Sequence, residues 1–293
     1  MENNHVIVQS NKLIEAHYKQ EYSIQEQRMI LWIISTIHKE DYINKKYEHK
    51  IITISATKYA ELIGVNANVI YREAQKIALA LMQKVIKIET SEGWKMFHWV
   101  ETMEYKRGEG VIEVLISPTI IPYIIDLKEK YTAFRLENIL YLNSAHAIKL
   151  YQLLAQYKTI GERTLTVDEL KSMLGISEVK TYQSYGSFKR RVLEISKREI
   201  NAKTNIIFDY DEIKKSRKIV KLKFKITTKP TQEEQAKQMF EAFISKKPEG
   251  DTIRTLFKQY GFTQSMVIVA FKEFIKKIPN YSPDSSSPIY LPE

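Results

Sequence analysis

Basic side chains recur at helical spacing in the segment SYGSFKRRVLEISKREINAKTN, residues 184–205. A helix turns by about 100° per residue, so this segment separates its side chains onto two faces, with Lys189 at the edge of the apolar arc. The apolar face comprises Phe188, Val192, Leu193, Ile195 and Ile200. The polar face comprises Ser187, Arg190, Arg191, Glu194, Lys197, Arg198 and Asn201. Clustered cations bind polyanions such as nucleic acid or an anionic membrane surface, although a charged face is also the ordinary exterior of a helix.

The segments on either side of this helix predict the remaining parts of a winged helix. Upstream, RTLTVDELKSMLGI has a short β-like run, then Thr166 and Glu169 at the spacing of a capping box, and Gly175 where a helix would end. Downstream, TNIIFDYDEIKKSRKIVKLKFKIT alternates apolar and charged residues on both sides of KKSRK, which indicates a β-hairpin with a basic tip. In a winged helix the second helix enters the major groove of DNA and the wing lies along the phosphates.

The net charge of the chain is concentrated in the same segment. Residues 187–225 contain thirteen Lys and Arg residues against five Asp and Glu residues, which is +8 of the +10 carried by all 293 residues. A basic balance alone does not distinguish nucleic acid from a membrane surface. Its concentration on a predicted helix and wing favours DNA.

The order of features in this unit occurs a second time, nearer the N-terminus. Residues 51–65, IITISATKYAELIGV, match residues 164–176 as a β-like run, a helix and a Gly-containing stop. A longer amphipathic helix, NANVIYREAQKIALALMQKVIKIE, and the strands of KMFHWVETMEYKRGEGVIEVLIS follow the earlier copy. Long core helices, predicted at 23–39 and 143–158, precede the two copies. The sequence therefore predicts two winged helices in tandem.

The second helix of the earlier unit is much less basic. It carries Arg72, Lys76 and Lys84 among many apolar residues. Two interpretations stay open for it, a packing or dimer helix and a second DNA contact.

Three stretches of the chain resemble a known family. They are YTAFRLENILYLNSAHAIKLYQLLAQY, TLTVDELKSMLGI and FKRRVLEISKREINAKTNIIFDYDEIKKSRK, in which an aromatic residue, a basic triplet, EIN and a basic wing follow in order. The chain is similar, over roughly residues 8–227, to the iteron-binding initiators of theta-type plasmid replication, the Rep proteins built from two winged-helix domains. The resemblance implies binding of repeated origin sites by monomers, repression of the protein's own gene, a weaker or repressive role for dimers joined through the first domain, and host partners such as a helicase.

The resemblance also assigns roles to the basic residues. Base reading falls to Ser187, Arg190, Arg191 and Glu194, and phosphate binding to Lys197, Arg198, Lys214, Lys215, Arg217 and Lys218, with Arg72 and Lys76 from the first domain. For the dimer, the β-like segments 86–90 and 111–116 are expected to leave an edge that can pair with a second chain.

The expected fold class is α+β, with tandem winged-helix domains and a C-terminal helical extension. The predicted divisions are 8–125 for the first winged helix, 126–228 for the second, 229–278 for the helical extension and 279–293 for a flexible Pro/Ser-rich tail. Two interpretations of the extension stay open, packing onto the second winged helix and docking of a replication partner.

The sequence lacks the motifs of two activities, strand transfer and ATP-driven unwinding of DNA. Strand transfer of the rolling-circle type needs a His-apolar-His metal pair, and the histidines are scattered (His5, His17, His38, His49, His98, His146). There is no G-x-x-x-x-G-K-[ST] phosphate loop and no cysteine. We therefore expect no enzyme, no cofactor and no metal. The absence of an 18-residue apolar run and of a secretory signal predicts a cytosolic protein. A transcriptional repressor without an initiator role is the alternative.

Overall fold

The computed structural model describes residues 5–37, 51–106, 108–125, 130–230 and 234. The chain divides into two units, Met1–Thr228 and Lys229–Glu293, and every element described below belongs to the first. The helical extension predicted at 229–278 and the tail at 279–293 lie almost wholly outside the described residues.

The second winged helix has the predicted parts in the predicted order. Strand β9 (Glu162–Thr166) leads into helix α8 (Val167–Met173), whose Thr166–Glu169 capping box is formed in both directions. Gly175 then takes the left-handed conformation at φ 72°. After a 3-10 turn, η2 (Lys180–Tyr182), the long helix runs through α9 (Tyr185–Phe188), the π-helical turn η3 (Lys189–Leu193) and α10 (Glu194–Lys203). We call it helix α9–α10.

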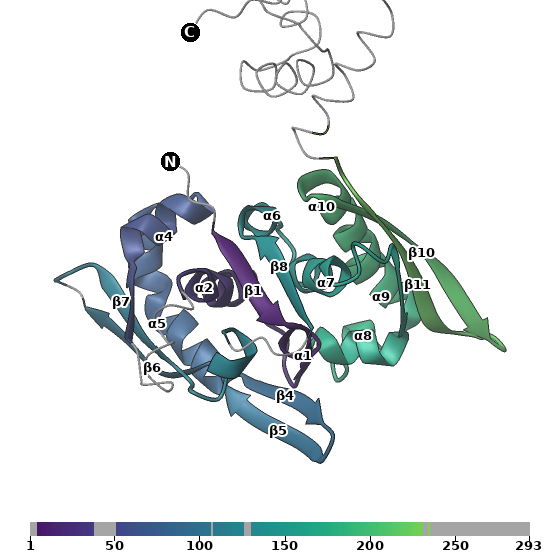
Figure 1. The fold of residues 1–293 in the computed structure, drawn as a ribbon, viewed down its shortest axis with the longest axis horizontal. Helices are drawn as coiled ribbons and strands as arrows, with labels where there is room; N and C mark the ends of the chain where they lie inside the picture. The colour runs from purple at the N-terminus through teal and green to yellow at the C-terminus, as the bar shows by residue number, and fades with distance from the viewer. Residues whose placement is uncertain (1–4, 38–50, 107, 126–129, 231–233, 235–293) are drawn as a thin grey trace, which may run out of the picture. The chain divides into compact units, whose positions relative to one another are not determined.

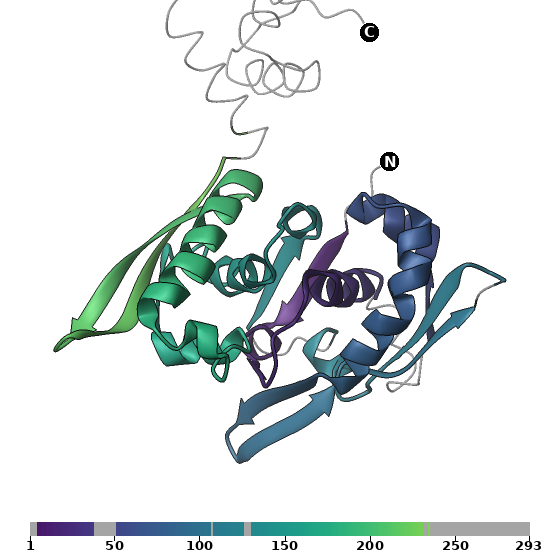
Figure 2. The ribbon, with the colours of Figure 1, turned by 180° about the vertical axis from the view of Figure 1, so that it is seen from behind.

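The wing of this unit is the hairpin of β10 (Ile206–Lys215) and β11 (Lys218–Thr228). Its sheet has the antiparallel order β10-β11-β9, so β10 is an edge strand. Figures 1 and 2 show the tip of the wing extending well beyond helix α9–α10.

The first winged helix repeats this topology. Strand β3 (Ile51–Ser55), helix α4 (Ala56–Ile63) and helix α5 (Ala67–Gln83) precede the hairpin of β6 (Val100–Lys106) and β7 (Val111–Ile116). The sheet order β3-β7-β6 corresponds to β9-β11-β10 in the second winged helix. Gly64 ends α4 at φ 70°, as Gly175 does after α8. The prediction of two related winged helices is confirmed.

One boundary in the first winged helix differs from the prediction. The helix predicted over 66–89 overlaps the β-like segment predicted at 86–90; in the structure α5 ends at Gln83, and Lys84 has extended backbone angles. Strands β4 (Val85–Thr90) and β5 (Gly93–His98) follow, in a sheet of order β2-β4-β5 with β2 (His17–Tyr18). The strand forms because Ile86 and Ile88 alternate with polar residues and both lie in the core.

The expected pairing edge is wrong at 111–116, because β7 is paired on both sides, by β3 and β6. Strand β4 pairs with β5 along its length and with β2 at Ile86 and Lys87, so its second edge is covered at these two residues of the expected segment 86–90. Val114 is fully buried. Among the described residues, the edge strands of these two sheets are β2 and β5, and β3 and β6.

Two buried helices lie at the predicted positions of the core helices. Helix α2 (Ile24–Ser35) begins at a capping box of Ser23 and Glu26, and helix α7 (Ala145–Ala155) is buried over nearly its whole length. The two helices contact each other. Among the described residues no helix is long and apolar enough to span a membrane.

The N-terminal segment joins the two winged helices. Strand β1 (Val6–Ser10) pairs with β8 (Tyr131–Arg135), a pair that crosses the predicted boundary between residues 125 and 126. The short helices α1 (Asn11–Ile14), η1 (Ile121–Tyr123) and α6 (Glu137–Leu140) complete this region. The domain boundary itself stays a prediction.

Polar and close contacts hold this joint. His17 Nδ1 lies 2.8 Å from Ser172 Oγ of α8, and a Cβ at Gly175 would overlap the backbone carbonyl of Gln20. Arg163 of β9 pairs with Glu15 at 2.7 Å. The two winged helices therefore contact each other through backbone as well as side chains.

Candidate nucleic-acid interface

Helix α9–α10 buries one face, as its sequence predicts, with one exchange of residues. Phe188, Val192, Leu193 and Ile200 are fully buried. Ile195 is only half-buried, and Ser196 lies in the core instead. The π-helical turn at Lys189–Leu193 explains the exchange, because a π turn contains an extra residue and shifts the positions that follow it.

The predicted base-reading residues lie on the exposed side of this helix. Arg190, Arg191 and Glu194 are exposed and Ser187 is half-buried. In the described part of the chain no carboxylate lies within ion-pair distance of either guanidinium. Arg190 and Arg191 are therefore available for the paired hydrogen bonds that arginine makes to guanine. Their role, like that of every predicted site residue, stays a prediction.

The carboxylates of residues 187–225 are all engaged by other side chains. Each has a partner: Glu194 with the Tyr210 hydroxyl, Glu199 with Lys203, Asp209 with Lys197, Asp211 with Lys225, and Glu212 with Lys189. Hydrogen bonds from Lys197 and Lys189 hold the pKa values of Asp209 and Glu212 below their ordinary values. Both carboxylates are therefore charged at neutral pH.

The remaining cations of the segment form the exposed basic surface of the second winged helix. Lys223 is not part of this surface, because it pairs with Glu162 at 2.8 Å. The cations that have no such partner are all exposed. Within the described residues, the basic side chains of 187–225 that have no carboxylate within 4 Å are Arg190, Arg191, Arg198, Lys214, Lys215, Arg217, Lys218 and Lys221. Lys197, a predicted phosphate contact, is not among them because it is bound to Asp209 at 2.7 Å.

Four of these cations stand at the tip of the wing. Lys214, Lys215, Arg217 and Lys218 flank Ser216, which has a left-handed φ of 57°. The strand pairing shifts between Ile213 and Lys214, and such a bulge increases the local twist. The tip thus presents a dense positive charge, which suits a phosphate backbone.

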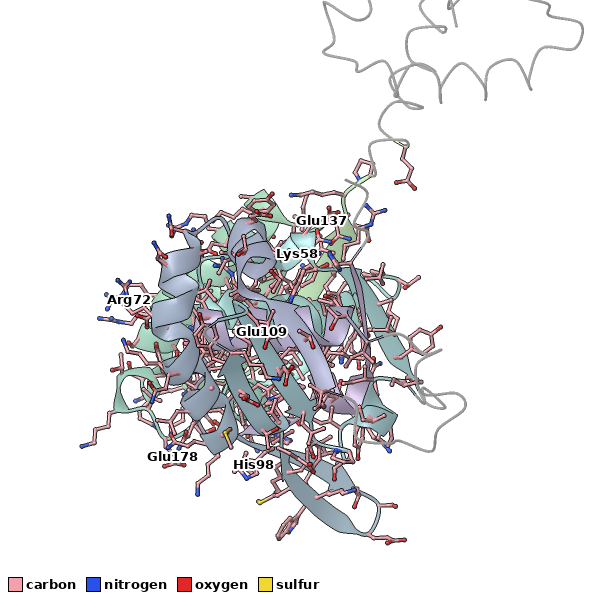
Figure 3. The ribbon with its side chains drawn as sticks, turned by 90° about the vertical axis from the view of Figure 1, so that its left-hand side faces the viewer. Lys58, Arg72, His98, Glu109, Glu137 and Glu178 are labelled. Atoms are coloured by element: carbon pink, nitrogen blue, oxygen red, sulfur yellow. The ribbon has the colours of Figure 1, made fainter. Side chains whose placement is uncertain are left out.

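The corresponding surface of the first winged helix is nearly neutral. Arg72 and Lys76 project into solvent from α5, and Figure 3 shows Arg72 at the outer side of this helix. Both pair with Glu73, each at 3.2 Å. Ion pairs this exposed contribute little stability and break easily in favour of other partners.

A groove of about 790 Å³ lies between α5 and the β6–β7 turn. Asn68, Arg72 and Gln75 line it from the helix, and Tyr105 and Glu109 from the hairpin. Asn68 and Gln75 are not among the site residues predicted from the sequence, although their spacing from Arg72 places all three on one helical face. Amide side chains pair with adenine in the major groove, so this groove has the chemistry of a second reading surface.

Comparisons with known proteins agree with this architecture. A family model described as initiator replication protein, WH1, matches residues 6–155, and one described as initiator Rep protein, WH2, matches residues 166–226. In Escherichia coli, the PI protein is 36% identical over 142 residues, which cover 43% of this chain and 46% of that protein. An uncharacterized 27.6 kDa protein of Escherichia coli is 21% identical over 214 residues, 70% of this chain and 88% of its own length.

A solved structure with a similar fold supports the same architecture. The crystal structure of Pi initiator protein in complex with iteron DNA matches with a TM-score of 0.58 and 22% identity, over 79% of this chain and 100% of that chain. This likeness shows the fold alone. The chain spans about half the length of the PI protein. The two family models confirm the resemblance: the chain belongs to the initiator replication protein family, whose members have the winged-helix domains WH1 and WH2.

Proposed function

We propose that this protein binds repeated double-stranded DNA sites at a plasmid origin and initiates replication there. The observation that carries the proposal is the exposed set of unpaired cations on helix α9–α10 and the wing, in a chain of the initiator family. A similar fold bound to iteron DNA, described as the Pi initiator complex, supports the same partner.

The proposed binding mode assigns different tasks to the two groups of cations. Helix α9–α10 enters the major groove, where Arg190 and Arg191 contact base edges. The wing tip and Arg198 lie against phosphates, which fixes the orientation and supplies affinity without sequence preference. The groove beside α5 contacts a neighbouring part of the same site through Asn68, Arg72 and Gln75. The protein acts by binding and not by catalysis, in the cytoplasm, where its plasmid resides.

Selection from random DNA followed by replication in trans tests the proposal. We expect the protein to select one sequence, and a plasmid that carries repeats of it and no other origin to be maintained only when the protein is supplied. Loss of maintenance with Arg190→Ala and Arg191→Ala together would tie replication to base reading. If the protein represses a promoter that carries the same repeats but does not maintain the plasmid, the result would favour a transcriptional repressor without an initiator role.

We further propose that a second copy of the chain binds the first winged helix, and that this dimer represses the protein's own gene. Strand β5 is a sheet edge, and its Trp94 and Met96 side chains are 61% and 50% exposed. Leu79 and Met82 of α5 add exposed apolar surface. An edge strand with apolar side chains is a ready template for pairing.

Sedimentation over a wide concentration range tests the dimer. Met96→Lys should shift the protein toward monomer and strengthen origin binding, since a charge on an edge strand opposes pairing. A lysine at Val114 of the paired strand β7 would not test the dimer, because Val114 is buried in the core and a charge there would disturb folding. Unchanged sedimentation of Met96→Lys would contradict the proposed face. A host replication protein such as a helicase is the expected further partner at the origin.

A further inference from the structure

Polar contacts join helix α9–α10 to the edge strand β10 along most of its length. At the start of the helix, the Tyr185 hydroxyl and Lys189 Nζ both donate to Glu212 Oε1, each at 2.8 Å. At the other end, the Asn201 amide donates to the carbonyl of Phe208 at 2.9 Å and accepts from its N–H at 2.8 Å. Asn201 thus satisfies the backbone of an edge strand that pairs only with β11 in the sheet.

Two further contacts lie between these ends. Lys197 Nζ donates to Asp209 at 2.7 Å, and the Tyr210 hydroxyl donates to Glu194. Residue numbers rise along the helix as they fall along the strand, so the contacts form a series, which we call the helix–wing ladder. Its members are Tyr185 and Lys189 with Glu212, Glu194 with Tyr210, Lys197 with Asp209, and Asn201 with Phe208.

The acidic members of the ladder lie in a surface that is otherwise basic. Carboxylates beside a phosphate backbone repel it, so Glu212 and Asp209 weaken simple electrostatic attraction to DNA. Glu212 is mostly covered, with its side chain 25% exposed, and its Oε1 already accepts two hydrogen bonds. Direct binding of DNA therefore does not explain why a carboxylate occupies this position in a basic surface.

We propose that Glu212 is a positioning residue for sequence-specific DNA recognition, fixing through Tyr185 and Lys189 the direction in which the wing leaves helix α9–α10. This inference rests on the DNA-binding function proposed above. Ser216, at the tip, lies four residues beyond Glu212, or roughly 13 Å along the strand. A rotation of about 10° at Glu212 then displaces the tip by about 2 Å, which is enough to separate a cation from its phosphate.

The consequence differs between specific and nonspecific DNA. On its own site the protein must place base-reading and phosphate-binding groups at once, which requires one wing direction. On other sequences the arginines are not bound to particular bases, so the protein can adjust its position until the tip meets phosphates. Fixing the wing therefore favours the specific complex.

Glu212→Gln tests the positioning role, because the change in affinity expected for the selected duplex is opposite in sign to the change expected from electrostatic repulsion alone. If Glu212 only repels DNA, its neutralisation strengthens binding to every duplex. As a positioning residue, its loss should weaken binding to the selected duplex by about tenfold, the size of a coupled contact, and leave a duplex of scrambled sequence unchanged or more tightly bound. Fluorescence anisotropy at one salt concentration measures both.

Asp211→Asn is the matched control, since Asp211 is the adjacent carboxylate of β10 and pairs with Lys225 of the sheet at 2.8 Å. It makes the same change of charge and should affect the selected and scrambled duplexes alike. If Glu212→Gln also changes both duplexes alike, in either direction, the proposal is wrong.

A charge exchange provides a second test. Lys189→Glu and Glu212→Lys should each lose discrimination, and the double variant should regain much of it, because the pair re-forms with its charges reversed. A double variant no better than the worse single one would count against the positioning role. If the unmodified protein does not discriminate between the two duplexes, the proposed function fails. If it discriminates and Glu212→Gln does so equally well, only the present inference fails.

Discussion

Substituting alanine at two equivalent glycines tests whether the contact between the winged helices stabilises the protein. Gly64 ends α4 with φ 70°, and Gly175 follows α8 with φ 72°. The backbone strain of an alanine is therefore the same at both positions. The surroundings differ, because a Cβ at Gly64 has nothing within 4 Å, whereas a Cβ at Gly175 would overlap the backbone of Gln20.

The magnitudes follow from these two terms. Left-handed backbone costs an alanine roughly 1–2 kcal/mol, which is the whole expected loss for Gly64→Ala. Overpacking against backbone adds about 1–3 kcal/mol, so Gly175→Ala should lose about 2–5 kcal/mol. For a unit of this size, 1 kcal/mol lowers the Tm by about 2–4 °C.

Urea unfolding followed by circular dichroism measures both free energies. Asparagine variants separate the terms, because asparagine tolerates the left-handed region. Gly64→Asn should be nearly neutral, while Gly175→Asn should remain destabilised by its overlap with Gln20. Equal losses for Gly64→Ala and Gly175→Ala would refute the reasoning. They would show that the close approach of Gly175 to the backbone of Gln20 does not add to the cost of the substitution.

Three further measurements test the DNA surface and the buried joint. Arg190→Ala should weaken binding to the selected duplex by about 1–3 kcal/mol and relax the preference at one base position in a repeated selection; an unchanged preference would contradict base reading. Lys218→Ala should weaken selected and scrambled duplexes alike and lower the salt slope by about one unit; a loss confined to the selected duplex would contradict phosphate binding. Lys149 of α7 is buried and donates to the carbonyl of Ile14 in α1 at 2.6 Å. Burial lowers the pKa of Lys149 to about 7, so the unfolded chain binds more protons above that pH, and the free energy of unfolding should rise by roughly 2 kcal/mol from pH 7 to pH 9. Lys149→Met should remove this rise, as measured by urea titrations at the two pH values.

Local signals were sufficient to predict the order of elements in both winged helices. Thr166 with Glu169, and the glycines at 64 and 175, act within one helical turn, so their spacing in the sequence already specifies the geometry. The wing could be predicted from the sequence for the same reason, because the alternation of apolar and charged residues and the basic turn are local properties.

Features that depend on tertiary contacts could not be predicted from local sequence signals. The apolar residues of α5 continue into Val85–Thr90, so the predicted helix at 66–89 overlapped the β-like segment predicted at 86–90, and the sequence did not show where the helix ends. The π-helical turn that exchanges Ile195 for Ser196 has no sequence signal that we could identify. Glu212 lies 23 residues from Lys189, and only the position of β10 against the helix brings them together.

The pairing of charges decides how many cations each winged helix has available for phosphates. In the first, Arg72 and Lys76 share Glu73, and the groove beside them offers amides, which carry no charge. In the second, four carboxylates of residues 187–225 bind lysines and Glu194 binds the Tyr210 hydroxyl. The exposed arginines and the lysines of the tip have no carboxylate within ion-pair distance among the described residues. Salt dependence is set by the number of phosphates that cations neutralise. It should therefore come mainly from the second winged helix, while the first, if it reads bases through Asn68 and Gln75, adds sequence preference with little effect on the salt slope.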